Sequence, residues 1–191
     1  MKIYDISQEL LGSAVYPGDP QPTVTKLCSM ADGDLYNLSH FCACAHNGTH
    51  IDAPYHFFDN GNTIDKMNID AFVGECYVVS FTGDINQADA QSIVAAANCP
   101  RIIIKGNATV TSDAARVFAS SGILLVGCEG QSVGDVNAPA EVHKILLSKN
   151  IALLEGIVLD SVIDGRYFLS CAPLNIEGFD GSPCRAILIE F

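Results

Sequence analysis

The spacing of apolar residues changes twice along the chain and divides it into three stretches. In residues 1–60, short alternating segments such as 2–6, together with a Pro/Gly turn at 16–20, predict strands and irregular loops. In residues 72–160, continuous apolar runs alternate with Ala-rich or amphipathic segments, which predicts strands alternating with helices. Residues 161–191 return to strand and turn.

The predicted strands are short runs rich in β-branched, aromatic or aliphatic residues. They are expected at residues 2–6, 36–45, 76–81, 101–105, 123–126, 151–154, 167–171 and 186–189. Three helices are expected at residues 84–98 (capped by Asp84 or Asn86), 112–120 (capped by Thr111 or Ser112) and 139–149. Buried strands between helices predict a single α/β domain over residues 1–191, with a parallel or mixed sheet flanked by helices.

The charge balance restricts the class of partner. The chain has 22 acidic and 10 basic residues, a formal net charge of -12, and would repel a phosphate backbone or an anionic membrane. No apolar run is long enough to cross a bilayer. Asp5 also lies where the apolar part of a secretory signal would be, so a cytoplasmic location is expected, without nucleic acid or membrane partners.

The eight cysteines are expected to be reduced, buried thiols. No secretory signal is expected, and most of these residues lie in apolar runs such as residues 41–45. No CxxC pair occurs, so a cysteine-based zinc site is not expected.

The candidate chemistry lies in residues 46–56. Three of the five histidines, His46, His50 and His56, occur there with Asp52 among them. Imidazole and carboxylate are the usual ligands of zinc, iron or manganese. A set of buried, hydrogen-bonded histidines on a β face is the alternative interpretation, but three histidines with a carboxylate favour a metal. His40 has no carboxylate at short spacing and is not included.

The spacing requires a bend in this segment. In an extended chain His50 and Asp52 share a face and lie about 6.6 Å apart, close enough for one ion. His46 and His50 would be about 13 Å apart in a straight strand, too far for metal–nitrogen bonds of about 2 Å. We expect the chain to bend at Gly48 and to turn again at Pro54 before His56.

Further ligands must come from elsewhere in the chain. His143 lies on the predicted 139–149 helix, and Glu155 ends the apolar run 151–154. A carboxylate at the end of a buried strand in an α/β sheet is where ligands collect. From spacing alone, a helix-surface histidine and a strand-end carboxylate explain the two residues equally well.

Residues 46–57 resemble the signature H-x-G-T-H-x-D-x-P-x-H of the cyclase family of metal-dependent hydrolases. That family includes bacterial kynurenine formamidases and isatin hydrolases. Residues 16–20, 129–134, 138–156 and 172–183 also resemble the family, so that the likeness covers nearly the whole chain.

The resemblance implies a role for each candidate ligand. His46, His50 and Asp52 would hold a first metal, and Asp52 would bridge to a second metal held also by His143 and Glu155. One or two divalent ions per chain are expected, with Zn²⁺ favoured and Mn²⁺ as the alternative.

The resemblance also implies a fold, an assembly and a reaction. The fold would be a swivelling β/β/α domain in a homodimer or homotetramer. His56 would transfer protons while a water activated by the metal attacks a carbonyl carbon. The expected substrate is a formamide or cyclic amide of a small aromatic molecule, such as N-formylkynurenine.

Three alternatives to this activity remain from the sequence. Lactone hydrolysis or cyclisation, within the same family, is one. Gly134 interrupts the Ser-Val-Asp run typical of kynurenine formamidases and Tyr16 stands where Trp is frequent, so these positions do not identify a formamidase substrate. A non-catalytic metal-binding module is the second. The third is nucleotide binding at Gly127 and Gly130, although the spacing does not match G-x-G-x-x-G.

Overall fold

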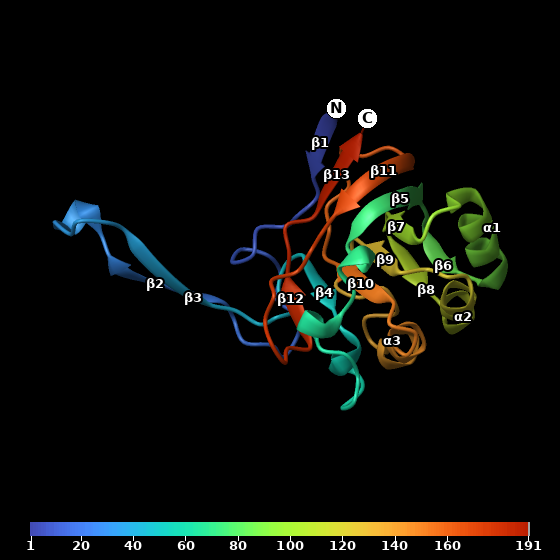
Figure 1. Ribbon diagram of the computed structural model, residues 1–191, viewed down its shortest axis with the longest axis horizontal. Coiled ribbons are helices and arrows are strands. Elements are labelled where there is room, and N and C mark those ends of the chain that lie inside the picture. Colours follow the sequence, from blue (N-terminus) through green and yellow to red (C-terminus); the bar gives the residue numbers. More distant parts are fainter. Residues whose placement is uncertain (191) are drawn as a thin grey trace.

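A nine-stranded mixed sheet forms the centre of the computed structural model, which describes residues 1–190 (Figure 1). In spatial order the strands are β1 (Lys2–Asp5), β13 (Ile187–Glu190), β11 (Gly165–Ser170), β5 (Val73–Ser80), β7 (Arg101–Lys105), β9 (Leu125–Cys128), β10 (Ala152–Glu155), β4 (His50–Asp52) and β12 (Gly181–Pro183). The four central strands, β5, β7, β9 and β10, are mutually parallel. The strands on either side of them pair antiparallel.

Three helices cover one face of the sheet: α1 (Gln87–Ala97), α2 (Ser112–Ser120) and α3 (Ala140–Leu147) (Figure 1). Alternate residues of the central strands face them, so Ile102 and Ile104 join the core beneath the helices, whereas Ile103 belongs to the core on the other side. Asn86 caps α1 and Thr111 caps α2 through their side chains. The predicted α/β architecture with a mixed sheet is confirmed.

The opposite face of the sheet closes around a second core. This core joins Ile51 of β4 to Leu188 of β13, although these strands lie near opposite ends of the sheet. The sheet is therefore curled. β4 carries two candidate ligands on one face, and Ile51 on its other face is fully buried in this core.

A long hairpin projects from this body (Figure 1). It consists of β2 (Thr23–Cys28), a short 3-10 helix η1 (Met30–Asp32) and β3 (Leu38–Cys42), and it forms its own two-stranded sheet. A second small sheet pairs β6 (Gly83–Ile85) with β8 (Ala108–Val110), and further 3-10 helices are η2 (Pro54–His56), η3 (Ile64–Lys66) and η4 (Ile69–Ala71).

Two expectations from the sequence need correction. Asp84 does not cap α1, because it pairs in β6 before the helix begins. The cysteines are free, as expected, but only Cys76, Cys128 and Cys171 are buried. Cys42 is exposed because the apolar segment that contains it leaves the body as part of the hairpin.

No helix in residues 1–190 has the length and hydropathy needed to span a bilayer.

Candidate active site

The pairing of β4 with β10 brings the first acidic and imidazole groups together. β4 alternates, so that Ile51 enters the core while His50 and Asp52 face the other way. The antiparallel register sets His50 opposite Glu155 and Asp52 opposite Leu153. Leu153 belongs to the core beneath the helices, so these polar side chains lie on the helix-covered side of the sheet.

A bend at Gly48 returns His46 to the same site. Gly48 has a φ of 63°, and Gly156, at the end of β10, has a φ of 68°. A Cβ on Gly156 would lie 2.5 Å from the carbonyl oxygen of Gly48, so the two loops touch through backbone alone. The result is a contact of 2.7 Å between Nδ1 of His46 and Oδ1 of Asp52. The predicted bend at Gly48 is confirmed.

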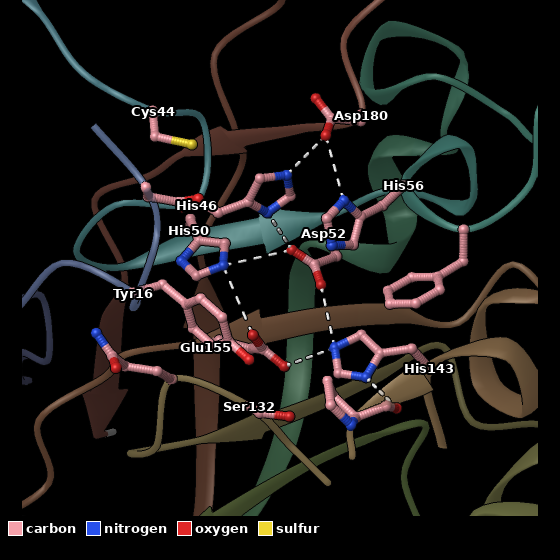
Figure 2. Close-up of a pocket in the computed structure, with 14 residues that line it drawn as sticks. Tyr16, Cys44, His46, His50, Asp52, His56, Ser132, His143, Glu155 and Asp180 are labelled. Carbon is pink, nitrogen blue, oxygen red and sulfur yellow. Dashed lines mark hydrogen bonds and ion pairs between the residues drawn. The ribbon is translucent and has the colours of Figure 1, made fainter. Parts of the chain in front are cut away.

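Helix α3 supplies His143, whose ring points towards the carboxylates of Asp52 and Glu155 (Figure 2). Its Nε2 lies 3.4 Å from Oδ2 of Asp52 and 3.3 Å from Oε1 of Glu155. Glu155 is held in place by the backbone N–H of Val133, which donates to its Oε1 at 2.8 Å. The structure therefore brings all five predicted ligands into one cluster, and four of them are almost fully buried.

Backbone carbonyls fix the orientation of two imidazole rings. Nδ1 of His50 lies 3.0 Å from the Gly48 oxygen, and Nδ1 of His143 lies 2.9 Å from the Pro139 oxygen. A carbonyl only accepts, so each Nδ1 is assigned as the N–H donor. Each Nε2 then directs a lone pair, in the neutral ring, at the buried carboxylates of Asp52 and Glu155. Such an arrangement is repulsive unless a proton or a cation lies between the groups.

The donor set fits a divalent metal. The ligand atoms of His46, His50 and Asp52 lie within 4.8 Å of one another, and so do those of Asp52, His143 and Glu155. Imidazole nitrogens with carboxylate oxygens suit zinc and manganese. Asp52 belongs to both sets, which is the position that a bridging carboxylate would take.

Without a metal, protons take the place of the positive charge. Burial by itself lowers the pKa of His46, but hydrogen bonds with Asp180 and Asp52 outweigh it and raise the pKa to about 11. The same opposition, with Asp52 and Glu155 as partners, raises the pKa of His143 to about 10. Burial would raise the pKa of Asp52, yet its three histidine partners hold that pKa well below its usual range.

Asp180 is a member of the site that the sequence analysis did not identify. Its Oδ2 accepts from Nε2 of His46 at 2.9 Å and from Nδ1 of His56 at 3.2 Å (Figure 2). These two hydrogen bonds hold the pKa of Asp180 well below its usual range. The residue lies far from the His46–His56 segment in sequence, and only the pairing of β12 with β4 places it there.

His56 stands at the open side of the cluster. It ends the 3-10 helix that begins at Pro54, and about 30% of its side chain is exposed. Its ring lies 4.1 Å from that of His46, centroid to centroid. Nδ1 faces Asp180, and Nε2 makes no hydrogen bond within residues 1–190, so this nitrogen is free to face a ligand.

The cluster forms the floor of a pocket of about 390 Å³. Tyr16, Phe57 and Pro139 contribute apolar walls, and the hydroxyl of Tyr16 donates to the carbonyl of Val136 at 2.9 Å. His40 lies on exposed β3 and does not line this pocket. The pocket thus combines a charged floor with flat apolar surfaces.

Comparison with known sequences gives full-length relatives. The family described as “Putative cyclase” matches residues 4–106. The chain is similar to the kynurenine formamidase of Erythrobacter litoralis (strain HTCC2594), with 30% identity over 203 positions that cover 99% of this chain and 94% of the relative. It is 32% identical to the kynurenine formamidase of Salinibacter ruber (strain DSM 13855 / M31), over 98% of this chain and 97% of that protein.

Solved structures share the fold. A predicted metal-dependent hydrolase from Bacillus stearothermophilus superimposes with a TM-score of 0.81 at 28% identity, covering 98% of this chain and 97% of the other. Isatin hydrolase A from Labrenzia aggregata, bound to benzyl benzoate, gives a TM-score of 0.83 at 19% identity, over 98% and 93% of the two chains. The second similarity supports the fold alone.

Proposed function

This chain belongs to the cyclase family, and we propose that it is a metal-dependent hydrolase that opens an amide bond in a small aromatic molecule. The observation that carries the proposal is the buried cluster of Asp52 and Glu155 with three imidazoles, beside a fourth imidazole that is open to the pocket. The two similar kynurenine formamidases support an amide as the bond that is cleaved.

The five clustered residues would hold the metal. His46, His50 and Asp52 form one set of ligands, and Asp52, His143 and Glu155 form the other, so that one or two divalent ions per chain are proposed. Zn²⁺ is the first candidate and Mn²⁺ the second. When bound, such an ion is a Lewis acid that lowers the pKa of a coordinated water and polarises a carbonyl oxygen.

His56 would move the protons. Its Nδ1 donates to Asp180, so its Nε2 can take a proton from water as the oxygen attacks the carbonyl carbon. The same nitrogen can return that proton to the leaving nitrogen as the C–N bond breaks, which yields a carboxylic acid and an amine. Imidazole suits both transfers near neutral pH.

Asp180 would position His56 and stabilise it while it carries the proton. Its carboxylate stays ionised because His46 and His56 both hydrogen-bond to it. A fixed negative group beside one ring nitrogen sets the tautomer and directs the other nitrogen towards the substrate.

The pocket favours a flat substrate with one reactive carbonyl. Tyr16, Phe57 and Pro139 offer apolar surface next to the charged floor, and a volume of about 390 Å³ is that of a small-molecule site. N-formylkynurenine is the first candidate to test, followed by cyclic aromatic amides. The eight free cysteines support the proposal that the protein works in a reducing compartment such as the cytoplasm.

A screen with controlled metal content tests this function. The protein is stripped with a chelator, reloaded with Zn²⁺ or Mn²⁺, and given N-formylkynurenine, isatin and an aromatic lactone. We expect turnover of at least one amide by the reloaded protein and loss of turnover after stripping. Turnover of the lactone alone would assign lactone hydrolysis in place of amide hydrolysis. Metal loading without turnover of any substrate would contradict the hydrolase proposal.

A further inference from the structure

The pocket carries one acidic side chain that the metal-binding cluster does not explain. Asp19 lines the cavity, but it belongs to none of the groups of side chains that could hold a metal ion. Its carboxylate makes no hydrogen bond or ion pair within residues 1–190. Because Asp19 is partly buried, this carboxylate has lost part of its hydration without gaining a partner from the chain.

A tight turn fixes the position of Asp19. The backbone N–H of Asp19 donates to the carbonyl of Tyr16 at 3.0 Å, and Pro17 and Gly18 occupy the central positions of the turn. Gly18 has a φ of 102°, which a turn of this kind requires at its third residue. The turn is therefore held by backbone alone, and the Asp19 side chain remains available to a ligand.

Two hydrogen bonds hold this turn against the loop between β9 and α3. The side-chain amide of Gln131 donates to the carbonyl of Ala14 at 2.7 Å, and the hydroxyl of Tyr16 donates to the carbonyl of Val136 at 2.9 Å. The side-chain oxygen of Gln131 makes no hydrogen bond in the part of the chain that the structure describes. Gln131 lines the pocket as well, so the same wall offers a second hydrogen-bond acceptor.

No fixed positive charge faces Asp19 across the cavity. Among residues 1–190, the side chains that line the pocket include no Lys and no Arg, and its histidines all belong to the cluster on the floor. The whole chain adds to this imbalance with 22 acidic and 10 basic residues. A field of this sign attracts cationic ligands to the pocket and disfavours anionic ones.

We infer that Asp19 selects substrates that carry a protonated amine, which its carboxylate binds while the amide carbonyl lies over the floor of the pocket. The side-chain oxygen of Gln131 is the second acceptor for this amine. A cavity of about 390 Å³ suits an aromatic ring with a short side chain. The inference rests on the proposed function and narrows it to aryl amides with an amino group on that side chain. In N-formylkynurenine, it assigns the α-amino group to Asp19 and leaves the α-carboxylate towards solvent.

Binding of a matched pair of ligands tests the inference without any turnover. The ketone 1-(2-aminophenyl)propan-1-one and its 3-amino derivative differ only in a terminal amine, and neither contains an amide to hydrolyse. By calorimetry on the protein reconstituted with Zn²⁺, we expect the 3-amino derivative to bind about tenfold more tightly, as for one charge-assisted hydrogen bond at a partly exposed site. Equal affinities for the wild type, or no binding of either ligand, would overturn the inference.

A pair of variants assigns the preference to one carboxylate. Asp19→Asn keeps the size of the side chain and the backbone hydrogen bond of the turn, and it should remove the difference between the two ligands. Asp160→Asn is the matched control, because Asp160 is exposed and does not line the pocket, and it should keep the difference. A preference for the amine that survives in Asp19→Asn would contradict the assignment.

Ionic strength separates an ion pair with Asp19 from coordination of the amine to the metal. The wall is partly exposed, so salt should screen the interaction, and the preference should shrink between about 0.05 M and about 0.5 M salt. The affinity of the neutral ketone should change little. A preference that does not depend on salt would indicate coordination to the metal and would overturn the inference.

Kinetics distinguishes a failure of this inference from a failure of the proposed function. When the ring amine of each ketone is formylated, the formamide with the terminal amine should have the higher kcat/KM, by about the same tenfold factor and mainly through KM. Equal kcat/KM values would overturn the selection by charge and leave the hydrolase. Binding of the amine through Asp19 without hydrolysis of either formamide would support the amine site and contradict the proposed function.

Discussion

Two regions of this molecule depart from the usual distribution of polar and apolar residues, in opposite directions. Around Asp52, the fold buries ionisable groups. In the β2–β3 hairpin, it exposes large apolar ones. Buried charges are costly unless compensated, and exposed apolar surface forgoes the hydrophobic stabilisation that burial gives. The comparison teaches that the two regions differ in what compensates them. The buried carboxylates and imidazoles require positive charge between them, from protons or a cation, whereas the hairpin leaves its large apolar side chains exposed.

The largest effect is expected when the buried carboxylate of Asp52 is removed. Asp52→Asn keeps the shape of the side chain but removes the carboxylate that both ligand sets share. We expect loss of bound metal by elemental analysis and a fall in kcat/KM of at least about a thousandfold, because metal activation of water is lost. Asp32→Asn, at the exposed hairpin tip, is the control and should retain its metal. Full metal content in Asp52→Asn would contradict the assignment.

Substitution of His56, whose imidazole is open to the pocket, should separate the catalytic step from metal binding. His56→Ala should leave the metal content unchanged while kcat falls by about 10²–10⁴, the usual contribution of a positioned acid–base group. His40→Ala, on exposed β3, should retain most of its activity. If His56→Ala kept full activity, the proton-transfer role would be wrong.

Asp180 should have a smaller effect, because it acts through His56. Asp180→Asn preserves the size of the side chain but weakens the hydrogen bonds to His46 and His56. We expect kcat to fall roughly 10–100-fold, as for other groups that orient catalytic imidazoles and ligands, with KM little changed. A change confined to KM would indicate a role in substrate binding instead.

The titration of the cluster provides the most subtle test. Without metal, the pKa values of His46 and His143 are raised to about 11 and about 10, so both rings carry protons at pH 8. Their contribution to stability is fully present below about pH 6.5, the unfolded value, and is lost as the pH rises through 10 to 11. The metal-free protein should therefore unfold at a lower temperature at pH 11 than at pH 8.

Metal binding at pH 8 should also release protons. Ligand imidazoles must be neutral, so roughly two protons should leave as the site fills. Calorimetry in two buffers of different ionisation enthalpy measures this number. Binding without proton release would show that His46 and His143 are neutral beforehand, which contradicts the charge balance described for the cluster.

Much of the cluster could be predicted from the sequence because its signals are local. His46, His50, Asp52 and His56 occur in one segment, and Gly48 marks the bend that the spacing requires. Asp180 could not be found in this way, because its place depends on the pairing of two short strands far apart in sequence.

The position of the hairpin outside the body could not be predicted from the pattern of apolar residues. β3 falls within the expected strand at residues 36–45, but β2 was not predicted. Alternating apolar residues look the same whether a strand joins a core or leaves the body, so the run containing Cys42 was wrongly expected to be buried. Tertiary contact, rather than local propensity, decides that outcome.

Metal content per chain tests the central claim most directly. Wild type and His143→Ala are reconstituted with Zn²⁺ or Mn²⁺, desalted and analysed for bound metal. We predict about two ions per chain in wild type and about one in the variant, because the variant loses a ligand from one of the two sets that share Asp52. A wild-type protein that retains no metal under either condition would contradict the account.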